Sequence, residues 1–248
     1  MVAAASKGIG LATAKLLAQE GCHVSICARN EEQLEAAASE IGHETRSYCV
    51  DVSDAEDLAW WLEQTESDLG PPDILVTNTG GPPAGSISQM TDENWQSGFE
   101  STLMNVVRLV RMVSPKMHTK GFGRIVHISS LVAMEPSPML PISSTLRSGL
   151  LALTRLQSTE LARHNITVNC VLPGHTLTDR QRHLAEIRAE KEGISAEAAL
   201  EKQGLETPVG RLATPEEVGA AAVFLCSVQA AYITGTSLLV DGGLVKGY

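Results

Sequence analysis

Short apolar segments alternate along the chain with longer segments that have the polar and apolar spacing of helices. The apolar segments are rich in Val, Ile, Leu and Cys, and they are the predicted strands: residues 22–28, 47–50, 74–78, 124–129, 166–172 and 237–240. Strands that alternate with helices are typical of a parallel sheet. The pattern therefore predicts an α/β fold with helices on both faces of the sheet.

Several of the predicted helices have readable ends. Asn30, Ser53 and Thr214 are each followed three residues later by Gln or Glu, which is the spacing of a capping box at a helix N-terminus. Gly21 and Gly70 stand where two helices are expected to end, because glycine readily adopts the left-handed conformation that closes a helix.

The first strand is short in this sequence. Only Met1, Val2 and Ala3 precede a glycine-containing turn, whereas a strand is usually about five or six residues long. Two interpretations are open: the central strand is unusually short, or the chain lacks a leading segment.

The chain has 248 residues, which suits one domain over residues 1–248, and it contains no repeat or plausible linker. Residues 176–208, here called the lid segment, are charged and helical in pattern and interrupt the alternation of strands and helices. Ligands of such sheets bind beyond the carboxyl ends of the strands. We therefore expect this segment to act as a lid over the site; the alternative is a solvated surface excursion.

Composition narrows the functional classes. Hydrophobic residues make up 43% of the chain without a run long enough to cross a membrane, and the first residues lack the pattern of a secretory leader, so none is expected. A net charge of −10 argues against nonspecific binding to nucleic acid. The five cysteines are unclustered, which favours buried reduced thiols over disulfides or metal ligands. We expect a cytoplasmic protein with no metal, no nucleic-acid partner and no membrane partner.

A glycine turn is the first candidate for ligand binding. Residues 4–10, Ala-Ala-Ser-Lys-Gly-Ile-Gly, lead directly into a predicted helix. Glycines at a strand-to-helix turn let backbone N–H groups approach a pyrophosphate at the helix N-terminus. Asp51-Val52 and Asn78-Thr79-Gly80 follow two further strands and strengthen this interpretation.

Together these segments resemble the short-chain dehydrogenase/reductase family, nearest to its 3-oxoacyl-acyl-carrier-protein reductase-like members. The resemblance covers essentially the whole chain, including Pro173-Gly174 and the closing Asp241-Gly242-Gly243. It implies a single-domain, doubly wound Rossmann fold with a parallel sheet of about seven strands. The cofactor-binding residues that it implies are Ser6, Lys7, Gly8, Ile9, Gly10, Arg29, Asp51, Val52, Asn78, Gly80, Arg147, Pro173, Gly174, Thr176 and Thr178.

Two positions in the cofactor region bear on binding. Ala4 stands where the family has glycine, and we expect an alanine to be tolerated there only if its φ is negative. Ala28 stands where NAD-preferring relatives carry an acid, while Arg29 and Lys7 can pair with a 2′-phosphate. We therefore expect NADP(H) to be preferred over NAD(H); the alternative is that both cations are ordinary surface residues.

The catalytic positions of the family are mostly replaced. Ser130 matches the serine that binds the substrate carbonyl. Ser143 stands at the position of the tyrosine that transfers the proton, Arg147 at that of the lysine, and Thr102 at that of the helix asparagine. A guanidinium stays protonated and cannot relay protons, and an aliphatic hydroxyl is far less acidic than a phenol. The sequence therefore predicts an atypical active site.

A substitute proton donor is not obvious. His175 directly follows Pro173-Gly174 and titrates in a suitable range, although it is also explained as a loop histidine. The stiff loop at residues 80–85 is expected either to wall the pocket or simply to connect two elements.

Two functional hypotheses remain from the sequence. The first is an NADP(H)-dependent oxidoreductase acting on a carbonyl or alcohol of a small molecule or acyl thioester, with Ser130 and a water or His175 in place of the tyrosine. The second is a catalytically silent NADP(H)-binding protein with a sensor or assembly role. By resemblance we also expect a homo-oligomer, a tetramer or dimer, that assembles through the helices at 95–120 and 144–164 and through the C-terminal strand.

Overall fold

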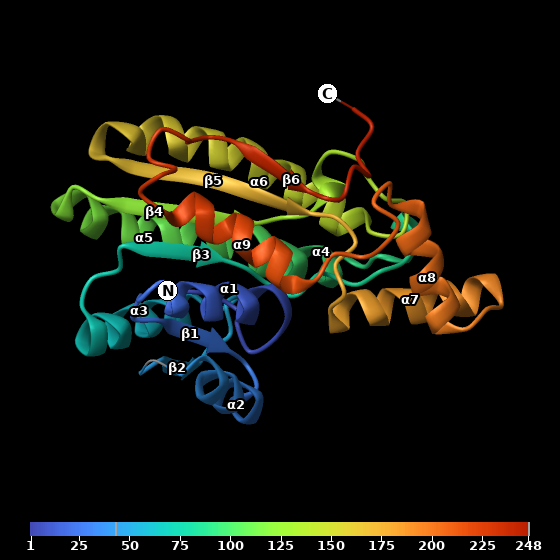
Figure 1. The fold of residues 1–248 in the computed structure, drawn as a ribbon, viewed down its shortest axis with the longest axis horizontal. Coiled ribbons are helices and arrows are strands. Elements are labelled where there is room, and N and C mark those ends of the chain that lie inside the picture. The colour runs from blue at the N-terminus through green and yellow to red at the C-terminus, as the bar shows by residue number, and fades with distance from the viewer. Residues whose placement is uncertain (43, 248) are drawn as a thin grey trace.

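The computed structural model describes residues 1–42 and 44–247 (Figure 1). The strands are β1 (Ser25–Ala28), β2 (Arg46–Cys49), β3 (Ile74–Thr77), β4 (Gly123–Ile128), β5 (Ile166–Pro173) and β6 (Ser237–Val240). The α-helices are α1 (Gly8–Gln19), α2 (Glu31–Ile41), α3 (Ala55–Leu69), α4 (Asp92–Phe99), α5 (Asn105–Lys120), α6 (Pro141–Leu161), α7 (Asp179–Glu192), α8 (Ala196–Glu206) and α9 (Pro215–Cys226).

All pairings in the sheet are parallel: β1 pairs with β2, and β3, β4, β5 and β6 follow one another. Val2 lies between these two groups and bridges both Ile26 of β1 and Val76 of β3. Its amide donates to the carbonyl of Ser25 at 2.8 Å. Three N-terminal residues therefore fill the central strand position, so the described part of the chain has six strands and this bridge rather than seven full strands.

Helices cover both faces of the sheet, as expected (Figure 1). On one face α3, α5 and α6 pack over apolar side chains such as Ile125, and on the other α1, α2 and α9 pack over side chains such as Val126. Neighbouring residues of β4 point to opposite faces because side chains alternate along a strand. Burial of one such aliphatic side chain contributes about 1.5–3 kcal/mol. These two cores make the sheet a rigid base for the loops at its edge.

The helix ends agree with the sequence with one exception. Asn30 accepts from the amide of Gln33, and Thr214 forms the expected capping box. The prediction that Ser53 begins a helix is wrong, because Asp54 accepts from the first amides of α3. The Ser53 hydroxyl instead donates to Asp51 at 2.6 Å, so it is not available as a cap.

The long helix expected at 95–120 is interrupted. It begins earlier, at Asp92, and contains a π-helical segment, η2 (Glu100–Met104), between α4 and α5. Thr102, at the centre of η2, is buried, and its hydroxyl has no hydrogen-bond partner among the described residues. A π-helical turn widens the helix locally, and such turns are frequent at functional sites.

The lid segment forms the pair α7 and α8, which projects beyond the carboxyl ends of the strands (Figure 1). Thr176, the first residue of the segment, pairs in a parallel bridge with Ala213, which lies beyond the end of the segment. Its action as a lid stays a prediction. Across the described residues, no helix has the length and apolar character needed to cross a membrane.

Candidate active site

A cavity of about 1150 Å³ lies at the carboxyl ends of the strands, between the loops that follow β1 to β5 and helix α7. All but one of the predicted cofactor-binding and catalytic residues line it. Those residues are Ser6, Lys7, Gly8, Ile9, Arg29, Asp51, Val52, Asn78, Gly80, Ser130, Ser143, Arg147, Pro173, Gly174, His175, Thr176 and Thr178. The exception is Gly10, which is buried beneath the glycine turn. Tertiary structure thus brings together residues that are far apart in the sequence.

Helix α1 begins at this cavity with its first amides uncapped. Lys7 stands at the N-cap position but supplies no side-chain acceptor. By contrast, α2, α3, α4, α7, α8 and α9 all receive a capping hydrogen bond from a side chain. Free amides and the positive end of the helix dipole are suited to an anion. The turn therefore fits the pyrophosphate of a dinucleotide.

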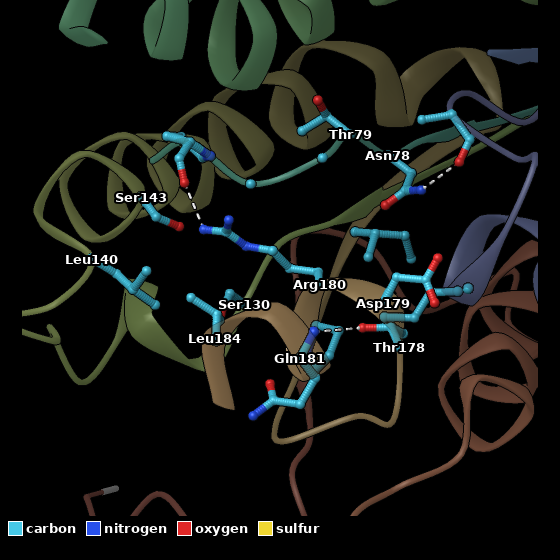
Figure 2. A pocket seen from close by; sticks show the side chains of 18 of the residues that line it. Asn78, Thr79, Ser130, Leu140, Ser143, Thr178, Asp179, Arg180, Gln181 and Leu184 are labelled. Atoms are coloured by element: carbon cyan, nitrogen blue, oxygen red, sulfur yellow. Dashed lines mark hydrogen bonds between the residues drawn. The ribbon is translucent and has the colours of Figure 1, made fainter. Parts of the chain in front are cut away.

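The glycine turn is packed tightly behind these amides. A Cβ at Gly10 would lie 2.5 Å from the Ala4 carbonyl oxygen and 2.9 Å from Nδ2 of Asn78. The Asn78 amide also donates to the Ala4 carbonyl at 3.1 Å, which ties the end of β3 to the turn (Figure 2). Only glycine leaves room at position 10 for this contact.

The expectation of a negative φ at Ala4 is wrong, because its φ is +48°. Left-handed backbone costs a residue with a Cβ roughly 1–2 kcal/mol. The turn keeps the shape that glycine would adopt because the carbonyl of Ala4 is fixed by Asn78 and its neighbour Ala5 pairs with Cys27 of β1. The surrounding contacts outweigh the local strain.

The end of the cavity beside the start of α1 is here called the nucleotide end. The two cations expected there, Lys7 and Arg29, are exposed and paired with acids. Lys7 lies 2.9 Å from Asp179 at the start of α7, and Arg29 lies 3.8 Å from Asp51. Burial raises the pKa of Asp51, but hydrogen bonds from Ser53 and the Arg29 guanidinium outweigh this, and the pKa is lowered overall. Both cations could exchange these carboxylates for a phosphate.

The threonines of the 176–178 loop are engaged within the protein. Thr178 accepts from the amide of Gln181 at 3.2 Å and caps α7 (Figure 2). The hydroxyl of Thr176 donates to the carbonyl of Gly174 at 3.2 Å. These residues shape the wall of the cavity, and their direct contact with a cofactor stays a prediction.

The part of the cavity lined by Ser130, Ser143 and Arg147 is here called the reacting end. These are three of the predicted catalytic residues. Ser130 follows β4, and its hydroxyl accepts from the amide of Val132 at 3.3 Å. Ser143 and Arg147 are buried one turn apart on α6. The Arg147 guanidinium donates to the carbonyl of Ile128 at 3.0 Å. Burial lowers the pKa of Arg147 to about 10, so the guanidinium stays charged at neutral pH.

Arg180 of α7 also reaches this end of the cavity, although it was not predicted as a site residue. Its Nη2 donates to the carbonyl of Pro82 at 2.5 Å, and a Cβ at Gly81 would lie 2.8 Å from its Nε. Figure 2 shows its side chain extending into the cavity toward Ser143. The sequence shows Arg180 only as one of several charges in the lid segment, because its partner is 98 residues away.

His175 lies on the lid side of the cavity. Burial lowers its pKa, and the charges that act on it belong to Glu206 and Arg188. Among the described residues it has no side-chain hydrogen bond to Ser130 or Ser143. Its role as proton donor therefore stays a prediction.

The sequence matches the family described as Enoyl-(Acyl carrier protein) reductase over residues 3–245. The 3-oxoacyl-[acyl-carrier-protein] reductase FabG of Escherichia coli (strain K12) is 34% identical over 244 residues, with 98% of this chain and 96% of that protein covered. The FabG protein of Chlamydia muridarum is 32% identical over 248 residues, with coverage of 98% and 96%.

Solved structures agree with these relatives. L-sorbose reductase from Gluconobacter frateurii, complexed with NADPH and L-sorbose, superposes with a TM-score of 0.94 at 34% identity, with 100% of this chain and 96% of that chain covered. An NADPH-bound short chain oxidoreductase from Pseudomonas aeruginosa PAO1, described as containing an atypical catalytic center, gives 0.89 at 33% identity, with coverage of 100% and 96%. The fold, the cavity and these similarities show that the chain belongs to the short-chain dehydrogenase/reductase family of oxidoreductases.

Proposed function

We propose that this protein is an NADP(H)-dependent reductase of carbonyl compounds, or in reverse a dehydrogenase of the corresponding alcohols. The observation that carries the proposal is the single cavity that joins the uncapped start of α1 to Ser130 and Arg147. NADPH is bound by the L-sorbose reductase and by the Pseudomonas oxidoreductase that resemble this chain.

The residues at the nucleotide end would bind the cofactor. The amides at the start of α1 suit the pyrophosphate, and Lys7 and Arg29 suit a 2′-phosphate because each offers charged donors to an oxyanion. Arg147 can donate hydrogen bonds to the nicotinamide ribose. NADPH supplies a hydride to the substrate carbon when it is bound. With no acid at position 28 to accept from ribose hydroxyls, NADPH is preferred over NADH.

At the reacting end, the Ser130 hydroxyl would donate a hydrogen bond to the carbonyl oxygen of the substrate. Arg147 supplies fixed positive charge close to the alkoxide that develops, which lowers the barrier electrostatically. A water held by the Ser143 hydroxyl protonates the alkoxide, and the hydroxide left behind equilibrates with solvent. His175 is the other candidate donor, if the lid segment moves it closer to the substrate.

The lid segment would close over bound ligands as a unit. It supplies Arg180 and Leu184 to the cavity wall, and it joins the rest of the fold at the bridge between Thr176 and Ala213. The substrate is a small carbonyl compound or an acyl thioester. A homo-oligomer is consistent with the exposure of Leu156 (69%) on α6.

A catalytically silent NADP(H)-binding protein is the second candidate. It is favoured by one observation, the presence of serine at position 143, because an aliphatic hydroxyl is far less acidic than a phenol and cannot take its role.

Titration of the purified protein with NADPH and with NADH, followed by cofactor fluorescence, tests the cofactor. Tight NADPH binding with weak NADH binding is expected, and binding of neither would contradict both candidates. Enzyme at high concentration is then incubated with NADPH and a panel of ketones, aldehydes and 3-oxoacyl thioesters. Oxidation of NADPH with any of them supports the reductase; tight binding without oxidation supports the silent protein.

A further inference from the structure

The cavity carries an excess of positive charge in an acidic protein. The chain has a net charge of −10, yet six Lys or Arg residues line the cavity against four Asp or Glu residues. The cations are Lys7, Arg29, Arg147, Arg180, Arg188 and Lys191, and the acids are Asp51, Glu135, Asp179 and Glu192. A cavity of this charge attracts anions.

The positive charge is not balanced at the reacting end. Lys7, Arg29 and Arg188 each pair with a carboxylate. Arg147 and Arg180 form no ion pair with an acid in the described part of the chain. Their guanidinium groups donate instead to the carbonyls of Ile128 and Pro82. They also lie close enough for the charge of Arg180 to act on Arg147.

Two unpaired guanidinium groups in a half-buried space are costly. A buried charge without a counter-charge is destabilising, and the proximity of two like charges adds to that cost. NADPH does not remove the imbalance, because its phosphates are expected at the start of α1, beside Lys7 and Arg29. Neither guanidinium therefore has a carboxylate partner in the described part of the chain, and the substrate can supply one.

Arg180 is placed to bind that anion. A guanidinium has five N–H donors, and one hydrogen bond, to Pro82, fixes that of Arg180. Its side chain extends toward Ser143 across the cavity (Figure 2). Ser143 is much smaller than the tyrosine that the family places there, so it leaves room for a second polar group beside the reacting carbonyl.

We infer that the substrate is an oxocarboxylate, a carbonyl compound with a carboxylate of its own, and that Arg180 pairs with this carboxylate. The planar fork of a guanidinium matches the two oxygens of a carboxylate. Arg180 is then the residue that determines specificity, while Ser130 and Arg147 act on the carbonyl. This inference rests on the proposed reductase function.

The first test compares acids with their neutral esters. Wild-type enzyme with NADPH is assayed with 2-oxobutanoate, 4-oxopentanoate and 5-oxohexanoate, each beside its methyl ester. In at least one pair, kcat/KM for the acid should exceed that for the ester. In Arg180→Gln, kcat/KM for that acid should fall by about 10- to 150-fold, the size of a charged hydrogen bond, and the ester should change little.

Arg182→Gln is the matched control, because Arg182 is an exposed cation of the same helix that does not line the cavity. The kcat/KM values of Arg182→Gln for the acid and for the ester should match those of the wild type. An equal loss for acid and ester in Arg180→Gln would overturn the inference, because Arg180 would then act on the carbonyl or on the shape of the site. If Arg180→Gln does not fold, Arg180→Lys should keep part of the preference for the acid.

The second test needs no turnover and separates failure of this inference from failure of the proposed function. Calorimetric titration with butanoate, pentanoate and hexanoate, each beside its amide, measures carboxylate binding with and without NADPH. Binding of a carboxylate but not of its amide, lost in Arg180→Gln and kept in Arg182→Gln, supports the inference even if no carbonyl is reduced. Equal rates for acids and esters in the first test, together with equal binding of acids and amides in the second, in wild-type protein, would overturn it.

Discussion

The two ends of the cavity are formed by different kinds of chemical group. At the nucleotide end the groups proposed to bind the cofactor are backbone amides at the start of α1, held by a turn in which Gly10 packs against Ala4 and Asn78. At the reacting end the groups are side chains, and the sequence predicts Ser143 and Arg147 at the positions of the family's tyrosine and lysine. A site built from backbone persists wherever the fold persists, whereas a site built from side chains can change within the same fold.

The charges at the two ends differ as well. Lys7 and Arg29 are exposed and paired with acids, so each pairing contributes little to stability. Arg147 is buried, and neither it nor Arg180 has a carboxylate partner among the described residues. The exposed cations can exchange their carboxylate partners for a phosphate at a low cost in free energy. The two arginines without a carboxylate partner instead indicate a ligand with its own negative charge.

The largest effect is expected from Gly10→Val at the nucleotide end. The new side chain would overlap the Ala4 carbonyl, so the turn must move. NADPH binding should be lost, and the free energy of unfolding should fall by about 1–3 kcal/mol, as for other overpacked sites. Fluorescence titration and chemical denaturation measure the two effects.

Gly149→Val is the control, because Gly149 lies in α6 with open space around its Cα. It should keep NADPH affinity and gain a few tenths of a kcal/mol, since valine is a better helix former than glycine. Unchanged NADPH binding in Gly10→Val would show that the tight turn does not form the nucleotide site.

The second effect is at the reacting end. Ser143→Tyr combined with Arg147→Lys places an acidic phenol beside a cation. The variant should reduce carbonyl compounds about 100-fold faster than the wild type, or more, because general acid catalysis typically contributes that much. Steady-state assays with the best substrate of the panel measure it. Ser143→Phe with Arg147→Lys fills the same space without a phenolic hydroxyl to donate a proton, so it should give no increase in the reductase rate.

An unchanged rate in the tyrosine variant would mean that pocket geometry, rather than proton supply, limits the reaction. Arg180 is the first residue to inspect in that case, because its guanidinium extends toward Ser143 (Figure 2).

The third effect is the change in NADPH affinity when Lys7, or the acid that pairs with it, is replaced. Lys7→Ala should lower NADPH affinity by about 10-fold and leave NADH affinity unchanged, because a charged hydrogen bond to the 2′-phosphate is lost. Asp179→Asn frees Lys7 from its ion pair and should raise NADPH affinity by about 1.5- to 5-fold, the size of a surface pair.

Fluorescence titrations at two salt concentrations check both values, because exposed charges are screened by salt. Lys15→Ala is the matched control, since Lys15 pairs with Glu40 and does not line the cavity. Equal loss of NADPH and NADH affinity in Lys7→Ala would argue against a role in cofactor choice.

The smallest effect is expected from Ala4→Gly. Glycine removes the cost of the left-handed backbone but makes the unfolded chain more flexible, so the net gain in unfolding free energy should be about 0.5–1 kcal/mol. Thermal or urea denaturation measures it. Ala5→Gly, at a neighbouring buried position without a positive φ, should be destabilising instead. A loss of stability in Ala4→Gly would show that no strain is stored at the turn.

Much of the molecule could be predicted from local sequence. The six strands and the caps at Asn30 and Thr214 were predicted in the correct order, with strand boundaries that shift by a few residues. These features depend on side-chain periodicity and on turn chemistry between near neighbours. Alternation of strand and helix then restricts the topology and places the loop residues at one edge of the sheet.

Other features could not be predicted because their partners are distant in sequence. The sequence left open whether Met1, Val2 and Ala3 are an unusually short central strand, and only the structure shows Val2 bridged to both Ile26 of β1 and Val76 of β3. The positive φ of Ala4 follows from its contact with Asn78, 74 residues away.

The sequence by itself determined the fold and the place of the glycine turn at the start of α1, and it predicts Ser143 at the position of the family's tyrosine, because these features depend on which residues follow one another. Only the tertiary structure decided which charges meet in the cavity. It paired Lys7 with Asp179, left Arg147 without a carboxylate, and carried Arg180 from the lid segment to the reacting end. Electrostatic energy depends on distance and burial in space, and neither quantity is encoded in the spacing of charges along the chain.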